Sequence, residues 1–121
     1  MFFHELRIKD IHGVVIYETN MKRWTAQDRK DHIVGIQLSG SALHVFNDKE
    51  FVISRNCIYF LNQKDNYNVE VYETPKALSI HFTTYDEIDT DSFCIPLTAG
   101  TELISILEKA KAMQETGDNL A

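Results

Sequence analysis

The sequence predicts a mainly β domain that is followed by one C-terminal helix. The chain has 121 residues, which is the size of a single domain. Between residues 6 and 97 the apolar residues fall in short runs rich in β-branched and aromatic side chains, with turn residues between the runs. After Pro96 the apolar spacing changes to that of a helix. We therefore expect a β-sandwich or β-barrel over residues 1–97, and a helix with a short tail over residues 98–121.

Each expected strand is an apolar run bounded by turn residues. The runs cover residues 6–18, 32–38, 43–46, 50–53, 57–61, 68–73 and 77–83. Gly13 predicts a bend or bulge inside the first run, and Ser39-Gly40-Ser41 ends the second. Asn47-Asp48-Lys49 predicts a tight hairpin turn. The basic segment around Trp24 and the acidic residues 86–91 are interpreted as solvated loops.

The expected helix spans residues 102–115, with Thr101-Glu102 at its start and Gly117 as its stop. Its apolar side chains cover an arc of about 180°, wider than the ~100° stripe that packing on one surface needs. The helix is therefore expected either to form a dimer interface or to be buried deeply in its own domain. The residues expected to carry dimerisation are Leu103, Ile106, Leu107, Ala110 and Met113. The abrupt tail predicts that the sequence is a piece of a longer chain.

Charge and composition exclude several classes of function. Twelve Lys and Arg residues against eighteen Asp and Glu give a net charge of −6, which repels nucleic-acid phosphates and anionic lipids. No apolar run reaches the ~20 residues of a membrane helix, and the N-terminus lacks the order of a signal peptide, so a cytoplasmic location is expected. Cys57 and Cys94 have no metal-binding or disulfide spacing and are interpreted as buried, reduced thiols.

Two expected strands combine an apolar face with a small, polar one. In residues 77–82 the small face consists of Ala77, Ser79 and His81, and in residues 34–39 it consists of Gly35, Gln37 and Ser39. If these faces line the interior, they build a pocket for a small molecule with several hydrogen-bonding groups. If they face water, they describe an ordinary half-exposed sheet.

Catalytic and metal chemistry find little support in the residue pattern. The five histidines include no His-x-His pair, so no metal site and no cofactor are expected. Neither cysteine stands at a recognisable catalytic spacing, and no Gly-x-Ser-x-Gly elbow or phosphate-binding glycine loop occurs. The chain is therefore not expected to be an enzyme.

The order of short motifs from residue 32 to residue 82 resembles the N-terminal cupin domain of AraC-type transcription regulators. The motifs are Leu38-Ser39-Gly40 at a corner, residues 47–50 at a hairpin, Arg55-Asn56-Cys57 at a turn, residues 60–64 where the family has a proline-rich corner, and His81-Phe82. Asn62 and Gln63 replace the two prolines of that corner, and Tyr67 stands where many cupins keep a metal-binding histidine. The resemblance implies a cupin-like double-stranded β-barrel, with the helix after Pro96 in the place of the family's dimerisation helix.

The resemblance also implies where an effector would bind. Its contacts map onto Gln37, Ser39, Tyr67, Val69, Ala77 and Ser79, and His81 shares the small face of Ala77 and Ser79. Because Ser39 stands where a sugar-binding relative carries arginine, an anionic or arabinose-like ligand is not expected. The implied function is an effector-sensing, homodimeric domain that reaches DNA only through a helix-turn-helix domain outside this chain. Alternatives are a small cupin enzyme with a degenerate metal site and a dimerisation module without a ligand.

Overall fold

The computed structural model describes residues 7–97, which form seven strands and no helix. The strands are β1 (Ile8–Glu18), β2 (Arg23–Ala26), β3 (His32–Val45), β4 (Glu50–Ser54), β5 (Cys57–Leu61), β6 (Tyr67–Thr84) and β7 (Phe93–Pro96). The expected mainly β class is confirmed. The expected helix at 102–115, with Leu103, Ile106, Leu107, Ala110 and Met113, lies outside the described residues.

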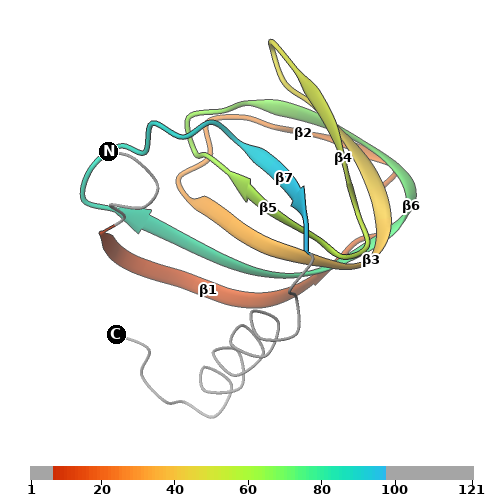
Figure 1. Cartoon of the computed structure of the whole chain (residues 1–121), viewed down its shortest axis with the longest axis horizontal. Coiled ribbons are helices and arrows are strands. Elements are labelled where there is room, and N and C mark those ends of the chain that lie inside the picture. Colours follow the sequence, from red (N-terminus) through yellow and green to blue (C-terminus); the bar gives the residue numbers. More distant parts are fainter. Residues whose placement is uncertain (1–6, 98–121) are drawn as a thin grey trace.

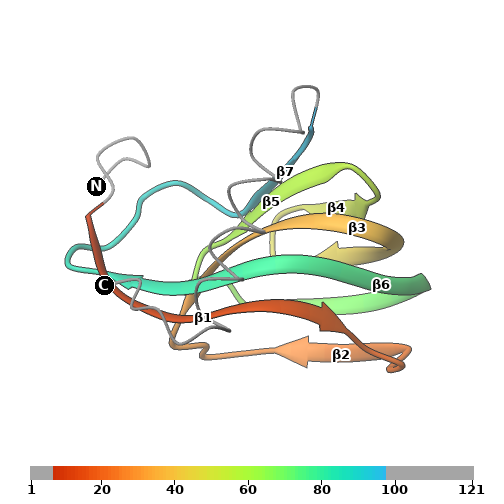
Figure 2. The same ribbon diagram turned by 90° about the horizontal axis from the view of Figure 1, so that it is seen from below.

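All strand pairs are antiparallel and belong to one sheet, which the two longest strands divide into two halves. In the five-stranded half, the order is β1, the second half of β6, the first half of β3, β5 and β7. In the four-stranded half, β2 pairs with the first half of β6 and β4 pairs with the second half of β3. Figure 1 shows β3 and β6 curving together from one half into the other, and Figure 2 shows the same curve from below.

The curve of β3 and β6 depends on irregular pairing at their centre. The register shifts between Gln37 and Ser39, between Ser39 and Ser41, and between Ser41 and Ala42. Gly40 has a positive φ of 78°, and a Cβ atom there would overlap the carbonyl oxygen of Thr74 on β6. Such bulges bend a strand without ending it.

This bend corrects the sequence-based strand boundaries. Residues 39–41 do not end a strand, because β3 continues through them as one element of 14 residues. Residues 68–73 and 77–83 likewise belong to the single strand β6 of 18 residues. The predicted bulge and the predicted hairpin turn are both confirmed. β1 has a register shift between Ile11 and Gly13, and residues 47–49 form the turn that joins β3 to β4, with Val45 opposite Glu50.

Two short strands were not predicted. β2 lies in the basic segment that was interpreted as a solvated loop, and it pairs residue by residue with the start of β6, from Arg23 opposite Glu70 to Ala26 opposite Tyr67. β7 pairs with β5 at the outer edge of the five-stranded half. The acidic segment 86–91 contains no strand, as expected, although Ile88 within it is buried.

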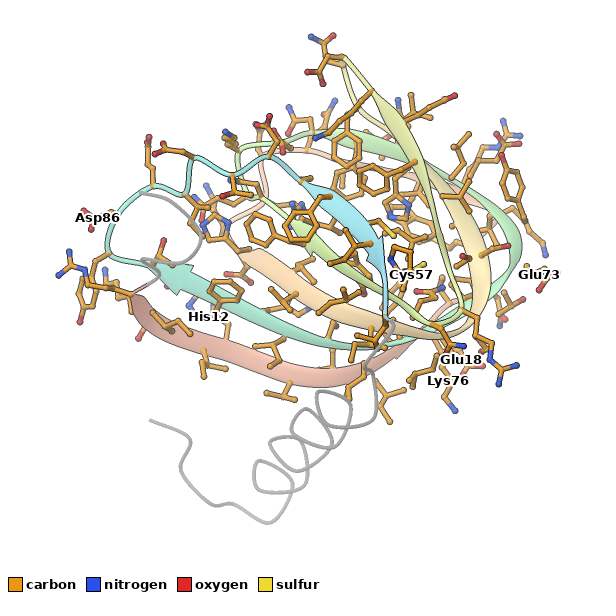
Figure 3. The ribbon with its side chains drawn as sticks, in the orientation of Figure 1. His12, Glu18, Cys57, Glu73, Lys76 and Asp86 are labelled. Carbon is orange, nitrogen blue, oxygen red and sulfur yellow. The ribbon has the colours of Figure 1, made fainter. Side chains whose placement is uncertain are left out.

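An apolar cluster fills much of the space between the two halves. It consists of Ala42, Phe46, Ile53, Tyr59, Leu61, Tyr67, Val69 and Ala77. Charged side chains such as Glu18, Glu73 and Lys76 are exposed instead, and Figure 3 shows Glu18 and Lys76 close together where β1 pairs with β6. Among residues 7–97, no helix has the length and apolarity needed to cross a membrane.

Candidate ligand-binding cavity

A cavity of about 230 Å³ lies between the two halves of the sheet. Every strand except β7 contributes side chains to its wall, and most of these side chains are apolar or aromatic. The lining residues are Tyr17, Trp24, Ala26, Arg29, Ile33, Gln37, Ala42, His44, Ile53, Tyr59, Leu61, Tyr67, Pro75, Ala77, Ser79 and His81. Because several of them, including Tyr17 and Trp24, remain partly exposed, the cavity is accessible from solvent.

The small, polar face of β6 points into this cavity. Ala77, Ser79 and His81 all line it, and Tyr67 lines it from the other half of the same strand. From β3, Gln37 lines the cavity. Gly35 does not, because the ring of Tyr59 packs against it so closely that a Cβ atom at Gly35 would overlap the ring. Five of the seven residues predicted to contact a ligand therefore meet around one cavity.

Ser39 and Val69 do not line the cavity. Ser39 is exposed, because the register shift after Gln37 turns its side chain to the opposite face, and only its carbonyl oxygen accepts a hydrogen bond from Gln37 Nε2 at 3.1 Å. Before the bend the residues of β3 that line the cavity have odd numbers, Ile33 and Gln37, and beyond it they have even numbers, Ala42 and His44. Strict alternation had placed Ser39 on the same face as Gln37. Val69 is buried in the interior apolar cluster and contributes packing.

His81, in the cavity wall, belongs to a loose chain of polar groups that extends behind the wall to Asp31 and His12. Its Nε2 lies 3.5 Å from Ser79 Oγ, and its Nδ1 lies 3.9 Å from a carboxylate oxygen of Asp31. The other carboxylate oxygen of Asp31 lies 2.5 Å from Nδ1 of His12 on β1. Both distances from His81 exceed the about 2.6–3.2 Å of an activated serine–histidine pair. The arrangement favours hydrogen bonding to a ligand over nucleophilic attack.

Burial keeps His81 and His44 neutral near pH 7. Desolvation lowers the pKa of His81, with the nearby charge of Asp31 opposing the shift. His44 is only 7% exposed, and desolvation lowers its pKa to about 4. Its ring packs against Tyr67 at 5.3 Å and Phe51 at 6.1 Å between centroids. His44 therefore acts mainly as a polar member of an aromatic wall.

The lowered pKa of His44 predicts a loss of stability in acid. The unfolded chain binds a proton near the ordinary histidine pKa of about 6.5, whereas the folded chain resists protonation until about pH 4. The contribution of His44 to the free energy of unfolding is therefore fully present above pH 6.5. It falls as the pH drops toward 4, by about 2 kcal/mol between pH 6.5 and 4.5. His44→Phe should flatten that part of the profile in urea unfolding. An unchanged slope would contradict the assignment.

Several lining residues were not predicted, and Arg29 is the most important for chemistry. Its two terminal nitrogens each donate a hydrogen bond, to the carbonyl oxygens of Asp31 and Asn62, both at 2.9 Å. The guanidinium carbon lies 5.2 Å from the centroid of the Tyr67 ring. The sequence signal was the group of basic residues around Trp24. Only the pairing of β2 with β6 shows that this segment borders an interior.

No metal centre is apparent in the described part of the chain, where no three His, Cys, Asp or Glu side chains are grouped so as to hold an ion. No family model matches the chain, and no curated protein is significantly similar to it.

Proposed function

We propose that this chain is the effector-binding and dimerisation domain of an AraC-type transcription regulator. The single observation that carries the proposal is the convergence of Gln37, Tyr67, Ala77, Ser79 and His81 on one cavity between the sheet halves. The motif order of residues 32–82 supports the same proposal, since the resemblance implies four of these five positions, Gln37, Tyr67, Ala77 and Ser79. In this proposal the fold is cupin-like, the protein is cytoplasmic, and a small molecule binds in the cavity.

A ligand screen with a cavity-filling variant tests the proposal. A compound that binds only the folded chain at a hundred times its dissociation constant adds about 2.7 kcal/mol of stability, which a thermal-shift screen of metabolites detects. Ala77→Leu places a larger side chain in the cavity and should abolish the shift caused by any hit. Lys76→Leu is the matched control, because Lys76 is the exposed neighbour on the opposite face and should leave binding intact.

Two outcomes contradict this function. The first is a broad panel in which no compound stabilises the wild-type chain, which favours a dimerisation module without a ligand. The second is a hit that stabilises Ala77→Leu as much as the wild type, which places binding outside the cavity. Circular dichroism of both variants establishes that each is folded before the comparison is made.

The dimer belongs to the same proposal and rests on the apolar arc of residues 102–115. Leu107→Glu introduces a charge into that arc and should convert a dimer into a monomer, because burying an unpaired carboxylate is strongly unfavourable. Analytical ultracentrifugation measures the change, and an unchanged sedimentation coefficient contradicts it. DNA binding is assigned to a domain outside this chain, so the chain alone should not retard operator DNA.

A further inference from the structure

We infer that the cavity selects a small aromatic carboxylate and that Arg29 is the residue that recognises its negative charge. This inference rests on the proposed function and names the class of ligand. The sequence argued against an anionic ligand because Ser39 occupies the position of an arginine. The structure brings a different arginine, from the segment after β2, into the wall of the cavity.

Arg29 carries a positive charge that no carboxylate of the described residues neutralises by an ion pair. Within residues 7–97 its hydrogen bonds go to two backbone carbonyls, and its Nε is buried without a partner. The carboxylate of Asp31, two residues further on, instead contacts His12 and faces His81. An arginine is always protonated and presents five N–H donors in a planar fork that suits a carboxylate.

The two carbonyl bonds also hold the guanidinium in place. They connect Arg29 to its own loop at Asp31 and to Asn62, which directly follows β5. The guanidinium also lies over the ring of Tyr67. A fixed cation loses little conformational freedom when a ligand binds, so the interaction contributes more to affinity than one from a mobile surface side chain. Among the described residues that line the cavity, Arg29 is the only Lys or Arg, so it gives the cavity its selectivity for a negatively charged ligand.

The remaining walls define the body of the ligand. Tyr17 and Trp24 meet edge to face at 6.3 Å, and Tyr59, Tyr67 and His44 add three further rings to the lining. Aromatic walls of this kind favour a flat, apolar ring. A cavity of about 150 Å³ holds benzene, so the volume here suits a ring with a carboxylate and one or two further atoms. Gln37 and Ser79 provide hydrogen-bonding partners for a hydroxyl substituent.

Benzoate and benzamide test this assignment, because the two have the same shape and differ in charge. In calorimetric titration of the full chain, benzoate should bind at least about tenfold more tightly than benzamide. Arg29→Gln should weaken benzoate by about tenfold to a hundredfold and leave benzamide unchanged, as expected for a hydrogen bond to a charged group. Arg29→Lys keeps the charge and should retain part of the preference. Arg23→Gln removes an equal charge from the exposed part of β2 and is the matched control.

The results separate failure of this inference from failure of the proposed function. If benzamide binds as tightly as benzoate, or if Arg29→Gln binds benzoate with wild-type affinity, the carboxylate assignment is wrong while a ligand-binding cavity remains. An equal loss in Arg23→Gln also overturns it, because overall charge then explains the effect. If neither compound binds but neutral metabolites stabilise the chain, the ligand class is wrong. If nothing binds at all, both proposals fall.

Discussion

Gly40→Ala should destabilise the domain by about 3 kcal/mol and abolish ligand binding. The residue has a positive φ of 78°, which costs an alanine roughly 1–2 kcal/mol. The new Cβ atom would also lie 2.6 Å from the carbonyl carbon of Thr74, and overpacking of this kind costs about 1–3 kcal/mol. The obstructing atoms belong to the backbone of β6, so no side-chain rotation relieves the contact. The midpoint of urea unfolding measures the effect.

Gly13→Ala is the matched control, since it makes the same substitution at the bulge of β1. The nearest atom to a Cβ there is Cγ1 of Val15 at 3.8 Å, which is ordinary van der Waals contact. Its effect should stay within about 1 kcal/mol. If Gly40→Ala is as mild as Gly13→Ala, the bend between the two sheet halves is not held by the close approach of Gly40 to β6.

The bend at Gly40 also explains how far the fold could be predicted. Alternation of apolar and polar residues predicted the strand segments on both sides of residues 39–41 and the hairpin at 47–49, because each depends on neighbours in the sequence. Whether Ser39-Gly40-Ser41 ends a strand or bends it depends on β6, which lies more than thirty residues further along the chain. Local composition is the same in both cases. The continuity of β3 and β6 was therefore not predictable from the residues alone.

The candidate site divides in the same way. Ala77, Ser79 and His81 were predicted because side chains alternate strictly between the two faces of the sheet along the second half of β6. Ser39 was misplaced because the register shift reverses that alternation in β3. Arg29 follows β2, which has only four residues, too few for a periodic pattern that would reveal its pairing with β6. A side chain that enters a cavity from a loop leaves no pattern in its neighbours.

Asn62→Ala should destabilise the domain by about 3 kcal/mol, and the reason lies where the chain departs from the family that we propose for it. Asn62 is 1% exposed and stands at a corner where that family has proline. Its side chain donates to the carbonyl oxygens of Ile88 and Thr90, both at 2.9 Å, and accepts from the backbone N–H of Lys64 at 2.9 Å. Each buried group left without a partner costs about 1 kcal/mol or more.

The backbone of Asn62 adds two further connections that join this corner to the cavity. Its N–H donates to the hydroxyl of Ser92 at 2.8 Å, which a proline cannot do, and its carbonyl oxygen accepts from Arg29. Three side-chain hydrogen bonds thus take over the stiffening that a proline ring would supply, while the backbone holds the arginine that borders the cavity. Asn62→Ala keeps both backbone bonds and removes the three side-chain bonds. The loss of the side-chain bonds should loosen the 86–91 segment and, through this corner, the position of Arg29.

Two comparisons make the Asn62 prediction specific. Asn68→Ala removes an exposed amide that accepts one hydrogen bond, from Thr25 Oγ1 at 2.7 Å, and should cost about 0.5 kcal/mol or less in urea unfolding. Asn62→Asp keeps the acceptor for Lys64 but turns a carboxylate toward the carbonyl oxygens of Ile88 and Thr90, so at pH 7 it should be at least as unstable as Asn62→Ala. If Asn62→Asp is instead close to wild type, the two donated bonds do not hold the corner, and the stiffness of this segment must come from the packing of Ile88.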